Sequence, residues 1–237
     1  MTLKNALVTG GSGGLGLSVV RRLLAEDWQV TVLVHSEAGK KRLAAGFTEA
    51  LQNKRLTLVP GDATRQVDLD RVVTQMGQID GLVHLVGGFK GGKNVESYNE
   101  ADFQAMFTRN AFSTFVALKA VLPRMKKQKS GSIVAIAAKP ALYPGGENPV
   151  YAASKAALTN LVLSAAEEGR AAGVRANVLV PYVIDTEENR QWAGEATNTS
   201  AWVRPEAMAG TIAWLLSPAG AAVTGTALPL FGQKSLF

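Results

Sequence analysis

The sequence predicts one α/β domain, built on a doubly wound parallel sheet of about seven strands with helices on both faces. Short runs of β-branched residues and leucine alternate with segments of helical spacing, and a glycine-rich turn follows the first run. Strands that alternate with helices are joined by crossover connections and therefore lie parallel. The 237 residues, 47% hydrophobic and 19% charged, suit a single globular domain over residues 1–237.

Each strand is predicted from a short apolar run that ends at glycine, proline or polar residues. The run at residues 30–34 consists of β-branched residues and leucine, which is typical of a strand buried on both faces. Pro60 and Pro181 end two other runs. In chain order, strands are expected at residues 6–8, 30–34, 56–59, 81–86, 133–137, 178–180 and 228–231.

Helices are predicted between the strands. The spacing of apolar residues indicates helices at residues 17–25, 101–125 (one helix or two), 151–172 and 205–216. Pro205 suits a first helical turn, where the missing N–H costs nothing. The longest polar and irregular stretch is residues 186–204, and long loops of this kind often cover a binding site. We therefore expect a substrate lid there.

Composition excludes several kinds of site. The chain has no cysteine, so disulfides, thiol catalysis and cysteine-ligated metals are excluded. His35 and His84 are the only histidines, so no metal site is expected. We expect His84 to be packed or hydrogen bonded rather than to transfer protons. His35 is expected either beside the ribose of a cofactor or exposed.

Charge and hydropathy indicate a soluble, cytoplasmic protein. The net charge is +6, but no basic arm is present, which favours an anionic small molecule over nucleic acid as partner. Residues 207–232 carry no charge and are numerous enough to cross a bilayer, yet glycines and prolines interrupt them. No signal peptide or membrane segment is expected.

Residues 9–16 form a glycine-rich turn between the first predicted strand and the first helix. Gly10, Gly14 and Gly16 allow a tight turn and let a pyrophosphate approach the backbone. The helix start then offers free N–H groups and the positive end of its dipole. This context predicts a dinucleotide site that Ser12 and Leu15 also contact.

The residues after the second strand bear on the choice of cofactor. An NAD site places a carboxylate there for the ribose 2′-hydroxyl. Here the strand is followed by His35 and Ser36, and three cations lie at residues 40–42. Ser36 can hydrogen-bond a phosphate, so NADP is favoured. Glu37 keeps NAD open as the alternative.

Tyr151 and Lys155 begin the long helix predicted at residues 151–172. Their i, i+4 spacing places the phenol and the ammonium on one helix face. A nearby ammonium favours the phenolate, so we expect the pKa of Tyr151 to be lowered. The pair is therefore a candidate proton donor beside a hydride acceptor.

With these motifs the chain resembles the short-chain dehydrogenase/reductase family over nearly its whole length, which implies a Rossmann-type fold. Residues 9–16 and Tyr151-x-x-x-Lys155 match its two signatures. By resemblance, Asn110 orders a proton-relay water, and Asp62 and Ala63 hold the adenine. The resemblance also implies that further residues bind the cofactor, namely Gly87, Gly88, Pro181, Ile184 and Thr186.

One family residue is missing. The family has a serine thirteen residues before the tyrosine, where this chain has Ala138. Losing one hydroxyl that donates to the developing oxyanion costs about 10²–10³ in rate. The chain is therefore a weak carbonyl or 3-ketoacyl reductase, a reductase whose acceptor needs no such donor, or a non-catalytic nucleotide-binding redox sensor.

In motif detail the chain looks most like the quinonoid dihydropteridine reductase branch of that family, which also has Ala-Lys in place of the serine. The matching segments are residues 86–92, 138–139, 185–186, 189–190 and 202. This likeness implies an electron-poor ring as hydride acceptor. Substrate contacts are then expected from Ala138, Lys139, Trp192 and Trp202, although tryptophans packed on the core are an equal alternative.

The family resemblance also implies a homodimer or homotetramer. Such assemblies pair the long helices, here predicted from Asn110 and from Tyr151. The apolar side chains of Phe112 and Phe115 are compatible with an interface, and core packing explains them equally well.

Overall fold

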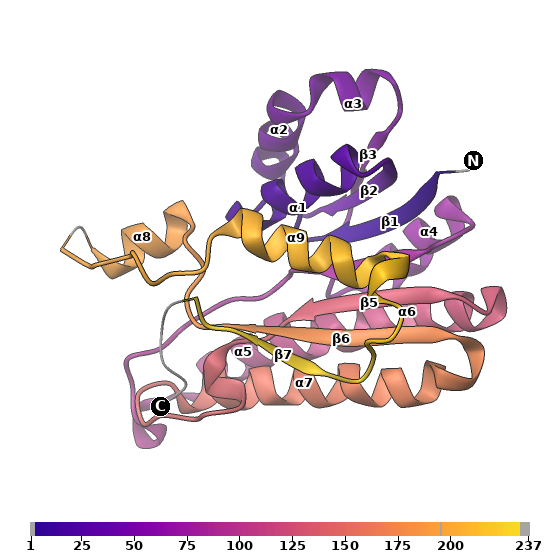
Figure 1. The fold of residues 1–237 in the computed structure, drawn as a ribbon. Coiled ribbons are helices and arrows are strands. Elements are labelled where there is room, and N and C mark those ends of the chain that lie inside the picture. Colours follow the sequence, from indigo (N-terminus) through magenta and orange to yellow (C-terminus); the bar gives the residue numbers. More distant parts are fainter. Residues whose placement is uncertain (1–2, 195, 233–237) are drawn as a thin grey trace.

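The computed structural model describes residues 3–194 and 196–232. Residues 1–2 and 233–237 of the predicted domain, and residue 195 of the predicted lid, lie outside the described residues. Within the described chain, strands and helices alternate as expected (Figure 1).

Seven parallel strands form one sheet in the order β3-β2-β1-β4-β5-β6-β7. The reversal of strand order lies between β1 and β4, which makes the sheet doubly wound. The predicted fold class is confirmed. The strands are β1 (Lys4–Thr9), β2 (Trp28–Val34), β3 (Leu56–Pro60), β4 (Gly81–His84), β5 (Gly131–Ile136), β6 (Val174–Pro181) and β7 (Ala227–Leu230).

Helices cover both faces of the sheet (Figure 1). One face packs against α1 (Gly14–Ala25) and α9 (Pro205–Leu216), with α2 (Glu37–Gly46) and α3 (Thr48–Gln52) near the β3 edge. The other face packs against α4 (Gln66–Met76), α6 (Ser113–Gln128) and α7 (Pro149–Gly169). Two core layers result, and β1 serves both because Leu7 points into one and Ala6 and Val8 point into the other.

The stretch predicted as one helix or two, at residues 101–125, is divided in the structure. It consists of α5 (Glu100–Phe107), one π-helical turn at Thr108–Phe112, and α6. A π turn carries an extra residue and is frequent at functional sites. Here it contains Asn110.

Sequence periodicity missed four helices. In α2 only Gly39 and Leu43 are buried, and in α4 only Leu69, Val72 and Val73. Such narrow apolar stripes are weak signals. The other two, α3 and α8 (Glu187–Ala193), have five and seven residues. Helix α8 lies inside the predicted lid.

β4 ends at His84, before the predicted end at residue 86. Leu85 still donates to the Thr9 carbonyl, 3.0 Å away, but the chain then passes the glycine-rich turn. No helix among the described residues has both the length and the apolar character needed to span a bilayer.

Candidate active site

A cavity of about 850 Å³ runs along the carboxyl ends of the central strands. This edge, next to the point where strand order reverses, is where open α/β sheets bind ligands. The cavity reaches from the glycine-rich turn to the start of α7. Predicted site residues that line it are Gly10, Gly14, Leu15, Gly16, Gly87, Gly88, Ala138, Lys139, Tyr151, Lys155, Pro181, Ile184, Thr186 and Trp192.

The glycine-rich turn is shaped for a phosphate. Gly10 has φ +74°, and a Cβ there would lie 2.9 Å from the Leu85 carbonyl carbon. A Cβ on Gly16 would lie 2.5 Å from the Gly10 oxygen. Because α1 starts at Gly14, the N–H groups of its first turn have no partner within the helix and can bind an anion at this turn. The turn therefore fits the pyrophosphate of a dinucleotide cofactor.

A second cavity, of about 330 Å³, lies at the ends of β2 and β3. It is lined by the predicted residues His35, Ser36 and Asp62, together with Lys40 and Arg65. Since it follows the second strand, it lies where the sequence predicts the adenine and ribose of the cofactor to bind. The predicted residues Ser12 and Ala63 line neither cavity, and Ala63 is buried in the core.

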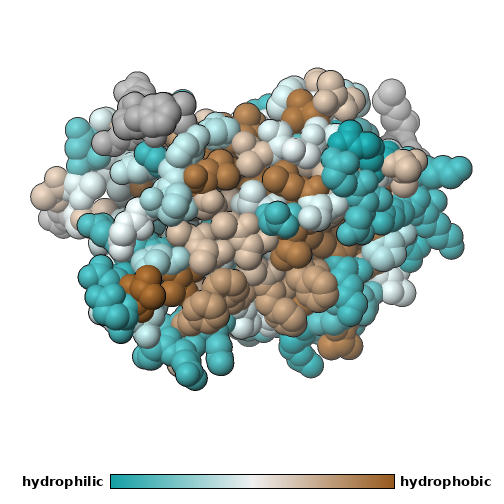
Figure 2. Space-filling view, turned by 90° about the horizontal axis from the view of Figure 1, so that it is seen from below, coloured by the Kyte–Doolittle hydropathy of each residue, from teal (hydrophilic) through white to brown (hydrophobic). Residues whose placement is uncertain are grey.

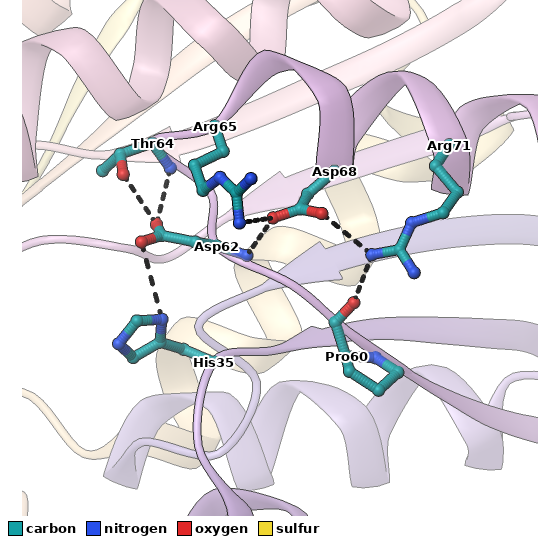
Figure 3. A network of polar contacts seen from close by, with 7 residues as sticks. All are labelled: His35, Pro60, Asp62, Thr64, Arg65, Asp68 and Arg71. Carbon is teal, nitrogen blue, oxygen red and sulfur yellow. Dashed lines mark hydrogen bonds and ion pairs between the residues drawn. The ribbon is translucent and has the colours of Figure 1, made fainter.

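A network of polar contacts holds Asp62 and Asp68, two of the residues that line this second cavity (Figure 3). Asp62 Oδ1 accepts from the N–H and the hydroxyl of Thr64, both at 2.8 Å, and its Oδ2 lies 3.7 Å from His35 Nδ1. Asp68 accepts the N–H of Asp62 at 3.1 Å and pairs with Arg71 at 3.0 Å. Burial raises the pKa of Asp62, but the Thr64 hydrogen bonds and nearby cations outweigh burial and leave that pKa below its ordinary value.

Ser36 caps α2. Its Oγ accepts the N–H of Gly39 at 3.1 Å, which satisfies one unpaired donor of the first turn. Only the oxygen of this hydroxyl is used by the helix, so its O–H can still donate to a ligand in the cavity that Ser36 lines. The lysine and arginine of this cavity are Lys40, which lies 3.9 Å from the Glu37 carboxylate, and Arg65, which lies 3.7 Å from that of Asp68.

An ion pair spans the glycine-rich turn. Arg42 of α2 donates to the Ser12 carbonyl at 3.3 Å and pairs with Glu188 of α8 at 3.2 Å. A Cβ built on Gly14 would lie 2.9 Å from Glu188 Oε2. The Glu188 carboxylate thus lies near the α1 N-terminus, beside the glycine-rich turn.

Tyr151 and Lys155 occupy the first two turns of α7. Lys155 is 5% exposed, and its Nζ donates to the Ile136 carbonyl at 2.8 Å. The Lys155 Nζ lies 6.0 Å from the centroid of the Tyr151 ring. The sequence spacing therefore does bring ammonium and phenol together, and both residues line the cavity.

Burial decides the protonation of both groups. It raises the pKa of Tyr151 to about 12 and lowers the pKa of Lys155 to about 8. The predicted lowering of the Tyr151 pKa is therefore wrong for this arrangement, because loss of hydration outweighs the nearby ammonium. At neutral pH the phenol is protonated, which is the form that gives up a proton during a reduction.

Asn110 is fully buried and does not line the cavity. Its Oδ1 accepts the Gly88 N–H at 2.9 Å, and its Nδ2 donates to the Gly88 carbonyl and to Ser154 Oγ at 3.0 and 2.9 Å. The π turn thus directs Asn110 at the loop after β4. Asn110 holds Gly87 and Gly88 beside α7, where a Cβ on Gly87 would lie 3.0 Å from Lys155 Nζ.

His84 is packed, as predicted. Its Nδ1 lies 2.8 Å from Thr9 Oγ1, and its Nε2 lies 3.1 Å from Ser113 Oγ. Burial, assisted by the charge of Lys155, lowers the pKa of His84 to about 3. A neutral imidazole with both nitrogens bonded braces β1 against α6.

Three of the four predicted substrate residues line the cavity. Ala138 and Lys139 lie just after β5, and Trp192 projects from α8. Trp202 does not line the cavity, because it is buried next to Val203, which pairs with Ile184. Sequence reasoning missed Phe89, Tyr143 and Tyr182, which also line the cavity, and no spacing rule marks aromatics in loops.

The short chain dehydrogenase family matches residues 4–196. The chain belongs to this family. Oxidoreductase YtkK of Bacillus subtilis is 31% identical over 246 aligned residues, covering 97% of this chain and 96% of YtkK. Levodione reductase of Leifsonia aquatica is 28% identical over 250 aligned residues, covering 97% and 93% of the two chains.

Solved structures of related proteins have the same fold as this chain. Levodione reductase superposes with a TM-score of 0.87 at 27% identity, over 97% of this chain and 96% of that one. A blue fluorescent protein from a metagenomic library, in complex with NADPH, gives 0.84 at 28% identity with the same coverage. The predicted family is confirmed. The finer likeness to quinonoid dihydropteridine reductase rests on the quoted motifs alone.

Proposed function

We propose that this protein is an NADPH-dependent reductase that delivers a hydride to a small cyclic acceptor. The observation that carries the proposal is the single cavity that joins the glycine-rich turn to Tyr151 and Lys155. The bound nicotinamide supplies the hydride. The protonated phenol of Tyr151 then gives its proton to the acceptor. Lys155 holds the nicotinamide ribose, and Asn110 keeps the loop after β4 in position.

The preference for NADPH over NADH rests on the second cavity. Ser36, Lys40 and Arg65 line it and offer one hydroxyl and two cations to a 2′-phosphate. Glu37 and Asp62 line it too, so NADH remains the alternative cofactor. The NADPH complex of the related blue fluorescent protein supports the preference.

The acceptor is proposed to be an electron-poor ring. Ala138 stands where a hydroxyl would polarise a ketone, so an acceptor that accepts hydride without such help suits the site. A quinonoid dihydropterin, a quinone and an activated ring ketone all have this character. The reductase activity in the name of the related levodione reductase supports a carbonyl acceptor equally well.

Titration with NADPH and NADH, followed by cofactor oxidation against quinonoid dihydropterin, quinones and simple ketones, tests the proposal. We expect turnover of ring acceptors and its loss, by about 10² or more, in Tyr151→Phe. Cofactor affinity should stay within about threefold, since one hydroxyl is removed. The second candidate function is a nucleotide-binding redox sensor, because Ala138 offers no side-chain donor. Tight NADPH binding without oxidation of the cofactor by any acceptor would support that function.

We also propose a homodimer or homotetramer that acts in the cytoplasm, with residues 186–204 closing over the acceptor. Figure 2 shows the molecule from below the view of Figure 1, in which α7 lies near the bottom. Apolar residues gather across the middle of the face seen there. Phe112, the last residue of the π turn, and Phe115, in the first turn of α6, are 48% and 43% exposed. Exposed apolar surface of this kind suits a second copy of the chain.

A further inference from the structure

Three aromatic rings follow one another along one part of the cavity wall. The Phe89 ring lies edge-on to Tyr151, with centroids 4.9 Å apart and planes at 90°. The Phe89 ring also contacts the Trp192 ring of α8, with the ring centroids 5.2 Å apart and the ring planes at 79°. Phe89 and Trp192 are 41% and 65% exposed although both are large and line the cavity. Exposed aromatic faces next to the proton donor suit a flat ring.

Lys139 rests on a second aromatic group, of which Tyr143 and Tyr182 line the same cavity. Lys139 Nζ lies 5.4 Å from the Tyr182 centroid and 5.6 Å from that of Phe231. The ring centroids of Tyr143 and Phe231 lie 6.1 Å apart. Tyr143 lines the cavity together with Lys139 and Tyr182. Contacts with two ring faces hold the ammonium in place while leaving N–H donors for a ligand.

The charges of the cavity single out Lys139. Its lining residues include three charged side chains, Lys139, Lys155 and the exposed Glu147. Lys155 is buried and bonded to the Ile136 carbonyl. Among ion pairs between described residues, none includes Lys139. The accessible cation of the acceptor region is therefore Lys139, immediately after Ala138.

We infer that the acceptor is a flat ring that carries an anionic substituent, bound by Lys139 while the ring lies against Phe89 and Trp192. This rests on the proposed reductase function and narrows its substrate class. In the reaction a hydride from NADPH forms a C–H bond at the ring carbonyl carbon, and the C=O π electrons take the proton of Tyr151. Ring ketone, NADPH and H⁺ give ring alcohol and NADP⁺.

The test uses two flat ketones that differ in one charge, isatin and isatin-5-sulfonate, with NADPH. For the unmodified protein we expect kcat/KM to favour the sulfonate by about tenfold, the size of one charge-assisted hydrogen bond. Lys139→Met should bring that ratio near one through the KM of the sulfonate, and Lys139→Arg should restore much of it. Lys127→Met, an exposed lysine on α6, serves as the matched control and should keep the ratio.

A ratio near one in the unmodified protein overturns the inference. So does a Lys139→Met variant that slows both ketones equally, because that result assigns Lys139 to polarising the carbonyl. If neither ketone is reduced, the proposed reaction fails on these acceptors, and the Kd values of both compounds for the NADP⁺ complex decide instead. Tighter binding of the sulfonate that Lys139→Met abolishes then supports anion recognition, and equal Kd values reject it.

Discussion

Lys155→Met should make this protein more stable while removing its activity. Burial lowers the pKa of Lys155 from 10.5 to about 8, so the folded state at neutral pH contains a charge that it disfavours. At 1.36 kcal/mol for each pKa unit, the charge costs about 3 kcal/mol. Methionine has nearly the same length and no charge. It also loses the charge-assisted hydrogen bond to the Ile136 carbonyl, worth about 1.5 kcal/mol.

The expected net gain is about 2 kcal/mol at pH 7, or roughly 4–8 °C in Tm for a chain of this size. The gain depends on pH in a defined direction. Lys155 has a lower pKa folded than unfolded, so the unmodified protein becomes more stable as pH rises from about 8 to 10.5. Lys155→Met lacks this dependence. Its advantage is therefore full below pH 8 and shrinks toward pH 10.5.

Calorimetric melts from pH 6 to pH 10, with Lys127→Met as an exposed control, measure this difference. The control should match the unmodified protein at every pH. A Lys155→Met variant that is less stable at pH 7, or whose difference stays constant to pH 10, would refute the reasoning. Either outcome would mean that the ammonium is well solvated or that its hydrogen bond dominates.

Three further outcomes are expected. Ala138→Ser should raise kcat on simple ketones by up to about 10²-fold, because it adds a donor to the cavity that Tyr151 also lines, and an unchanged kcat would place the missing donor elsewhere. Glu188→Gln should lower the Kd for NADPH by about threefold to tenfold, since it removes a negative charge next to the α1 N-terminus. Calorimetric titration measures the Kd, and weaker NADPH binding by the variant would contradict this prediction. Phe115→Asp should shift the protein toward monomer in sedimentation velocity, whereas Val67→Asp on the exposed face of α4 should not.

Local signals in the sequence were sufficient for the fold and for the two ends of the main cavity. Glycines at residues 10, 14 and 16 allow a tight turn directly before a helix, and the apolar runs identify parallel strands buried on both faces. The spacing of Tyr151 and Lys155 fixes their common helix face. These features depend on neighbours within about a turn of helix or one strand, so a linear reading captures them.

Other features depended on residues distant in sequence. Phe89, Tyr143 and Tyr182 come from three separate loops or strand ends and meet only around the cavity. Trp192 and Trp202 looked alike in sequence, yet one lines the cavity and the other is buried. The ion pair of Arg42 with Glu188 joins residues 146 positions apart.

The sequence by itself determined the alternation of strands and helices, the glycine-rich turn and the Tyr-Lys pair, because each follows from local sterics and periodicity. Only the tertiary structure decided which protonation states these groups have. The phenol of Tyr151 is kept protonated and the ammonium of Lys155 is made costly by burial, to which every packed element contributes. Loss of hydration is a property of the whole surrounding volume, and no spacing along the chain encodes it.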